Sequence, residues 1–213
     1  MRKISRFLLS GISVLTCMGC ATTTTVGVSG TNKAGMPIPP HVTYVVLPTS
    51  EVERDPAFSE YQELVTRQMD ARGYKRTSEK AAQLGVFLAY ATQRNVSVGS
   101  SASGGSGMGA AGGIGSGGSG SGSYGMTAEA SPEHPRYTNQ LVIVIVDLQQ
   151  SRTQRSTVEL WRGETFNTSH SNNLQRAAPL MVDAAFRHFG DTTAGQVQHT
   201  FGEKEADTIR GLK

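Results

Sequence analysis

Cysteine is scarce in this chain of 213 residues, and both cysteines, Cys17 and Cys20, lie near the N-terminus. The chain after residue 20 therefore has no disulfide, thiolate nucleophile or cysteine-ligated metal. Long apolar runs are also missing. The apolar stretch at residues 7–16 covers about half of the roughly 20 residues that a membrane-spanning helix needs, and we expect no such helix.

A charge excess is absent once the N-terminus is set aside. The chain has 20 Lys and Arg against 17 Asp and Glu, and the first 19 residues contain Arg2, Lys3 and Arg6 but no acid. The rest of the chain carries seventeen charges of each sign. A neutral chain has no broad positive field to gather phosphates, which argues against nucleic acid as a partner.

The N-terminus itself has the pattern of a secretion signal. A short cationic segment precedes the apolar stretch, and we predict a signal peptide over residues 1–19. The segment from Leu15 to Ala21 resembles the lipobox of bacterial lipoproteins, in which Gly or Ala precedes the acylated cysteine. Gly19 fits that place, and Cys20 is therefore the predicted lipidation site. The alternatives are acylation at Cys17, which follows Thr16, and an ordinary cleaved signal with two incidental cysteines.

This resemblance implies a lipid-anchored protein. Cys20 would carry a diacylglycerol thioether with palmitate-type fatty acids, and each buried methylene contributes about 0.8 kcal/mol to membrane binding. Ala21 in place of Asp resembles lipoproteins that are passed on to the outer membrane, which predicts a domain facing the periplasm; the cell surface and the inner membrane remain open. Residues 20–40, rich in Thr, Gly, Ser and Pro, are predicted to form a flexible stalk.

The remaining pattern predicts a single α+β domain over residues 41–190. Strands are expected at 41–47, 84–92, 137–148 and 158–166. One helix should open at Asp55-Pro56, with Asp55 as its N-cap and Pro56 in its first turn, and end at Gly73. A second should run to Phe189 with Pro179 in its first turn. This β-α-β-β-β-α order predicts a four-stranded mixed sheet with two helices on one face. Residues 191–213 are expected to be a loose tail or a short helix.

A low-complexity insert separates the second and third predicted strands. Residues 99–125 contain 13 glycines and 8 serines, and we predict a long disordered connection there. Residues 107–112 match G-x-G-x-x-G, but no helix follows, as a dinucleotide site requires. Chance matches are expected in such a composition, and no cofactor is predicted. The alternative is an insert whose apolar residues contact a partner or lipid.

Several short motifs of the domain occur in an order that resembles a known family. They are Tyr44-Val45-Val46-Leu47-Pro48, Asp55-Pro56-Ala57-Phe58 with Tyr61, Gly73-Tyr74, the strand from Leu84 to Tyr90, and Leu160-Trp161-Arg162-Gly163. Together they are similar to the bacterial lipoproteins of domain-of-unknown-function family 4136, over about residues 42–189 without the insert. The resemblance implies an α+β domain and no assigned catalytic residues.

No catalytic or metal-binding spacing appears in the sequence. The histidines show no i, i+4 pair and no H-E-x-x-H, and we interpret them as isolated surface residues and predict no metal site; they are His41, His134, His170, His188 and His199. Trp161, the single tryptophan, is predicted to be core. Asp147 and Arg162 are expected to form a cross-strand ion pair, or part of a polar pocket.

Two functional hypotheses follow. The first is a non-enzymatic envelope lipoprotein that binds an unidentified envelope protein or other envelope component through the exposed face or edge of its sheet. The second is an envelope hydrolase or sugar-modifying enzyme with a site assembled from loops. Its first candidate residues are Asp147, Arg162, His134 and His170.

Overall fold

The computed structural model describes residues 23–33, 35, 37–95 and 135–211. Its elements, in chain order, are β1 (Thr24–Asn32), β2 (Thr43–Pro48), α1 (Phe58–Ala71), β3 (Lys75–Arg76), β4 (Leu84–Asn95), β5 (Arg136–Asp147), α2 (Leu148–Gln154), β6 (Glu159–Ser169), α3 (Leu174–Phe186), β7 (Val197–Phe201) and α4 (Glu203–Arg210). The predicted signal peptide, Cys20 and the Gly/Ser-rich insert lie outside the described residues.

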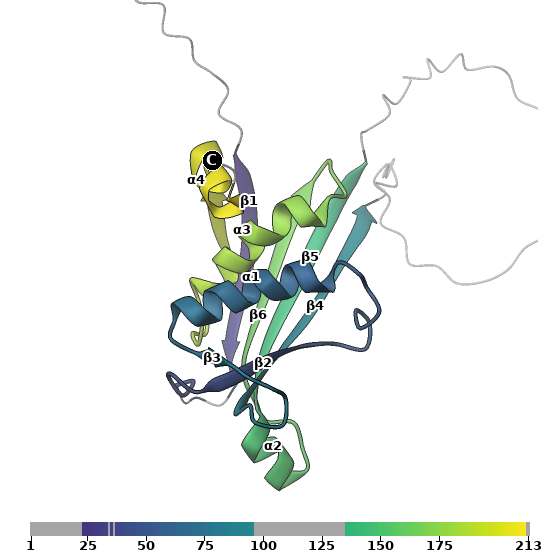
Figure 1. The fold of residues 1–213 in the computed structure, drawn as a ribbon. Coiled ribbons are helices and arrows are strands. Elements are labelled where there is room, and N and C mark those ends of the chain that lie inside the picture. Colours follow the sequence, from purple (N-terminus) through teal and green to yellow (C-terminus); the bar gives the residue numbers. More distant parts are fainter. Residues whose placement is uncertain (1–22, 34, 36, 96–134, 212–213) are drawn as a thin grey trace, which may run out of the picture.

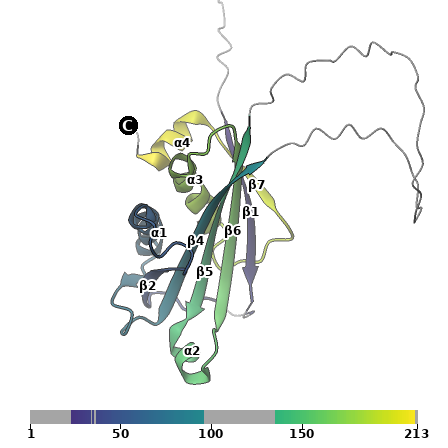
Figure 2. The same ribbon diagram turned by 90° about the vertical axis from the view of Figure 1, so that its right-hand side faces the viewer.

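All described strands join one mixed sheet in the order β3-β2-β4-β5-β6-β1-β7. Figure 1 shows α1 and α3 lying across one face, and Figure 2 shows α1, α3 and α4 on the same side of the sheet. No helix of the described chain covers the opposite face, and α2 projects beyond one end of the sheet. The predicted α+β class and mixed sheet are confirmed.

The four predicted strands correspond to β2, β4, β5 and β6. β2 pairs with β4 in parallel, as the intervening helix requires, and the β4–β5 and β5–β6 ladders are antiparallel. The predicted number of strands is wrong, because the sheet has seven. The three additional strands are the two-residue β3 and two strands from segments that we expected to lie outside the domain.

The most consequential correction concerns the predicted stalk over residues 20–40. Within it, Thr24–Asn32 form β1, which lies between β6 and β7 and is antiparallel to both. Val26 and Val28 are fully buried beneath the helices. β1 is stable because both of its edges are paired and its valines lie in the core, although its Thr, Gly and Ser residues gave only a weak strand pattern.

The predicted C-terminal tail is also part of the domain. β7 pairs with β1 from Thr24 opposite Phe201 to Val28 opposite Val197. α4 follows immediately and packs its Ala206 into the core. The alternative of a short helix is correct for α4, but the description of the segment as a loose appendage is wrong.

The described chain has four helices instead of the two predicted, and the boundaries of the predicted two also differ. α1 begins at Phe58 with Ala57 as its N-cap, so the predicted start at Asp55-Pro56 is wrong by two to three residues. The helix ends before Gly73, whose φ of +82° is the left-handed conformation that favours glycine at this place. α3 begins after Asn173, whose side chain accepts a hydrogen bond from the Arg176 N–H at 3.0 Å, and it runs without a break to Phe186 rather than to Phe189. Pro179 therefore lies inside this helix rather than in a first turn.

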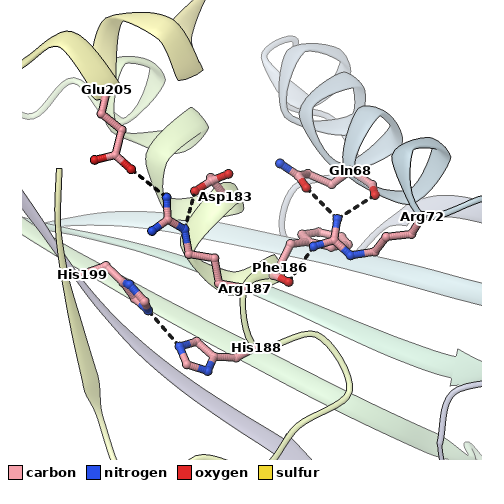
Figure 3. A network of polar contacts seen from close by, with 8 residues as sticks. All are labelled: Gln68, Arg72, Asp183, Phe186, Arg187, His188, His199 and Glu205. Carbon is pink, nitrogen blue, oxygen red and sulfur yellow. Dashed lines mark hydrogen bonds and ion pairs between the residues drawn. The ribbon is translucent and has the colours of Figure 1, made fainter. Parts of the chain in front are cut away.

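The core lies between the sheet and the two long helices. Trp161 is fully buried, as predicted, and its indole N–H donates to the Asp191 carbonyl at 3.1 Å. Its ring lies so close over Gly163 that a Cβ there would be 2.3 Å from it. At the same end of the helix pair, Arg72, the residue after α1, donates to the Phe186 carbonyl of α3 at 2.7 Å and stacks 4.8 Å above the Phe186 ring (Figure 3).

We predict that Val28→Asp unfolds the domain or lowers its free energy of unfolding by more than about 3 kcal/mol, because it buries an unpaired carboxylate. Thr31→Asp, at an exposed position of the same strand, should change it by less than about 0.5 kcal/mol. Urea denaturation of the chain from residue 20 onward measures both. Equal, small effects would mean that β1 is not part of the cooperative core.

Candidate functional site

The candidate site is the sheet face that no described helix covers, which we call the open face. Because successive side chains of a strand point to opposite faces of the sheet, every second side chain points to this side, away from α1 and α3. Its central apolar side chains are partly exposed rather than buried. They are Val45 and Leu47 on β2, Phe87 and Ala89 on β4, Val142 and Val144 on β5, and Phe166 on β6.

The register brings these side chains into one continuous patch. Leu47 lies opposite Phe87, Phe87 opposite Val144, and Ala89 opposite Val142. Phe166 forms the edge of the patch towards β1, where the Gln196 side chain lies against Gly27. Four strands about 4.8 Å apart, over some six residues each, give an area on the order of 400 Å². Apolar patches of this size on single domains are often functional.

A charged network lines one side of the patch. Arg162, opposite Val144 on the neighbouring strand, donates to both carboxylate oxygens of Glu159 at 3.0 Å. Lys33 and Glu164 extend this network, at 3.4 Å from Glu159 and 3.8 Å from Arg162 respectively. Burial alone would raise the pKa of Glu159, but its contacts with Arg162 and Lys33 outweigh burial and hold the pKa below its usual value. This edge of the patch thus stays charged.

A second feature is a polar cavity of about 530 Å³ at the end of the sheet where β1 begins. It lies between the first residues of β1, the β6–α3 connection and α4, and its lining includes Thr25, Asn167, His170, Arg176, Asp207 and Arg210. The Asn167 amide donates to the Thr25 carbonyl at 2.9 Å, and the Arg210 guanidinium donates to the Arg176 carbonyl at 3.1 Å. Sequence reasoning missed this cavity, because the predicted stalk and tail supply two of its three walls.

The structure brings two of the predicted isolated histidines together. The Nε2 atoms of His188 and His199 lie 2.8 Å apart, which joins the segment after α3 to β7 (Figure 3). Next to them, Arg187 bonds Asp183 and Glu205, each at 2.9 Å. No group of three or more potential metal ligands occurs among the described residues. The two histidines are eleven residues apart, which is not the i, i+4 spacing of paired ligands on a helix, so nothing in the sequence indicated that they would meet.

The described residues named as first candidates for a hydrolase, Asp147, Arg162 and His170, are not brought together in one site. The Asp147–Arg162 ion pair is wrong: Asp147 caps α2 by accepting the Gln150 N–H at 2.8 Å, and Arg162 is bound to Glu159. The register explains this, because Asp147 lies opposite Leu84 whereas Arg162 lies opposite Val144. His170 lines the polar cavity, and His134 lies outside the described residues.

The fold and the open face define a class, namely α+β domains with helices on one side of a mixed sheet. Within that class, the chain belongs to the family described as Domain of unknown function (DUF4136), whose model matches residues 41–189. β1, β7 and α4 lie outside the matched segment.

Two solved structures are similar to this chain. A PDZ domain protein from Parabacteroides distasonis has a TM-score of 0.52 and 16% identity, over 84% of this chain and 39% of that one. The chain thus spans well under half the length of that protein, and the likeness concerns the fold alone. The PelC dodecamer from Paraburkholderia phytofirmans has a TM-score of 0.43 and 10% identity, over 78% of this chain and 99% of that one. No curated protein matches the chain.

The histidine pair predicts a pH dependence of stability. Burial, followed by the charges of His188 and Arg187, lowers the pKa of His199 against the opposing effect of Asp183 and Glu205. The folded state thus binds this proton less readily than the unfolded state, and stability falls as the pH drops below about 6.5. We expect His199→Gln to lose less stability than the natural chain between about pH 7.5 and 5.5.

Thermal unfolding at a series of pH values measures this difference. His41→Asn is the matched control, because His41 has a φ of +58°, which Asn tolerates, and it is not part of the pair. If His199→Gln and the natural chain lose the same stability on acidification, His199 is not the cause of this pH dependence.

Proposed function

We propose that this protein is an envelope lipoprotein whose domain is a non-catalytic binding module, anchored by acylated Cys20 and facing the periplasm from the outer membrane. Its open face binds another envelope protein. The observation that carries the binding part is the apolar patch around Phe87 and Val144, which the described chain leaves partly exposed in the middle of a sheet.

Support for the anchor comes from the sequence. Cys20 follows a cationic and apolar leader and is preceded by Gly19. In the described part of the chain, no helix has both the length and the apolar character that crossing a membrane requires. An acylated N-terminus would provide the attachment, because several acyl chains together bind a bilayer stably.

The charges beside the patch favour a protein partner over insertion of the open face into lipid. Arg162 lies opposite Val144 and binds Glu159, and transferring such charges into hydrocarbon is costly. An apolar centre with a charged, solvated rim is instead the usual anatomy of a protein interface. We therefore expect the partner to present an apolar surface with polar groups that complement this charged network.

The anchor is tested by Cys20→Ser. We expect this variant to accumulate as unprocessed precursor and to lose incorporation of radiolabelled palmitate completely, because serine has no thiol for the thioether. Cys17→Ser is the matched control and should mature normally. Normal processing and lipid label in Cys20→Ser would move the anchor elsewhere or remove it.

The open face is tested by photo-crosslinking in living cells. A photoreactive residue at Ala89, in the apolar patch, should give a discrete protein adduct, whereas one at Glu63, on the exposed side of α1, should not. Val144→Lys should remove the Ala89 adduct while changing stability by under about 1 kcal/mol, because the lysine stem can lie on the face with its amine in water. Equal adducts at both positions, or none at Ala89, would argue against this function.

A further inference from the structure

The distance between the predicted anchor and the folded domain is short. Thr23 is the first described residue after Cys20, and β1 begins at the next residue. Three residue steps span at most about 11 Å even when fully extended. If Cys20 carries its acyl chains in the bilayer, the beginning of β1 must therefore lie close to the headgroup layer. The flexible stalk over residues 20–40 that the sequence suggested is therefore not available to hold the domain off the bilayer.

The strand register shows what else lies at this end of the sheet. Thr24 pairs with Phe201 at the end of β7, while Asn95 at the end of β4 pairs with Arg136 at the start of β5. Ser169, which ends β6, lies opposite Tyr137. Figure 1 shows these ends together with α4 and the β6–α3 connection, on the side away from α2. We call this end of the domain the proximal end.

The proximal end has the polarity that a headgroup layer requires. The polar cavity opens here, and its lining combines the hydroxyls of Thr23–Thr25 and amide groups with charges of both signs, among them Arg176 and Asp207. The sheet also has polar side chains at this end. For example, the Thr92 hydroxyl donates to the Asn139 side-chain oxygen at 2.8 Å. Such groups can exchange hydrogen bonds with water, phosphates and ammonium groups, whereas apolar side chains here would favour insertion into the hydrocarbon.

The long axis of the sheet points away from this end. β5 has twelve residues, so its two ends are about 40 Å apart, and α2 extends the far end. Val144, in the apolar patch, lies eight residues from the start of β5, or about 26 Å along the strand. An upright domain would thus hold the patch above the headgroups.

From these observations we propose that the proximal end of the domain lies against the phospholipid headgroups of the bilayer that holds Cys20, with α2 farthest from the membrane. The proposal rests on the acylated Cys20 of the proposed function and adds a fixed orientation to it. The open face then stands in the aqueous periplasm, where a protein partner can reach it.

Fluorescence quenching by acceptor-labelled lipids tests this orientation. The acylated chain is reconstituted into vesicles of phosphatidylethanolamine and phosphatidylglycerol, with one introduced cysteine carrying a donor dye. Its thiol is the only free one, because Cys20 is consumed by the lipid and Cys17 is removed with the signal. The labelled variants are Thr168→Cys at the proximal end, Ala89→Cys on the open face and Gln154→Cys at the end of α2.

We expect quenching to decrease in the order Thr168, Ala89, Gln154, with a several-fold difference between the first and the last. Twelve Gly and Ser residues inserted after Ala21 are the matched control and should largely abolish the difference. Equal quenching at all three positions in the natural chain, or the strongest quenching at Ala89, would overturn the proposal. A chain that carries no fatty acid by mass spectrometry and stays off the vesicles would instead refute the anchor, and with it the proposed function.

Discussion

The pairing of β1 with β6 is the interaction on which the rest of this structure depends. It places Val26 and Val28 under the helices, gives β7 a partner strand, and lets Gly30 lie opposite Gly163 beside the Trp161 ring. Without β1, the long antiparallel ladder would end at β6 with an unpaired edge, and β7 with α4 would have no strand to join. A segment close to the predicted anchor is therefore part of the fold.

The C-terminal segment is held by several contacts of different kinds. His199 on β7 meets His188, and Arg187 bonds Glu205 while its guanidinium lies 5.0 Å from the centre of the Phe201 ring. These contacts all join the end of α3 to β7 and α4, and Figure 3 shows the histidine pair and the Arg187–Glu205 bond. The result is a domain larger than the family-matched segment, in which the first and last described strands pair with each other and complete one side of the sheet.

The sequence predicted the elements that have strong patterns, and it failed where tertiary pairing decides. β5 was predictable because its six residues from Leu141 to Val146 are all β-branched or leucine. β1 was not, because Val26 and Val28 alternate with Gly27 and Ser29 and are too few to distinguish a strand from a stalk. The apolar patch follows from the alternation of predicted strands, whereas the cavity needed segments that sequence reasoning had placed outside the domain.

The central claim is that the domain begins almost directly after the proposed anchor at Cys20, with β1 as an integral strand. Hydrogen–deuterium exchange on the acylated protein in vesicles tests it most directly. The account predicts that the amides of β1 that bond to β6 and β7 exchange as slowly as those of β5, since all belong to one cooperative sheet. Exchange of the β1 amides at the rate of an unstructured chain, with β5 protected, would contradict it.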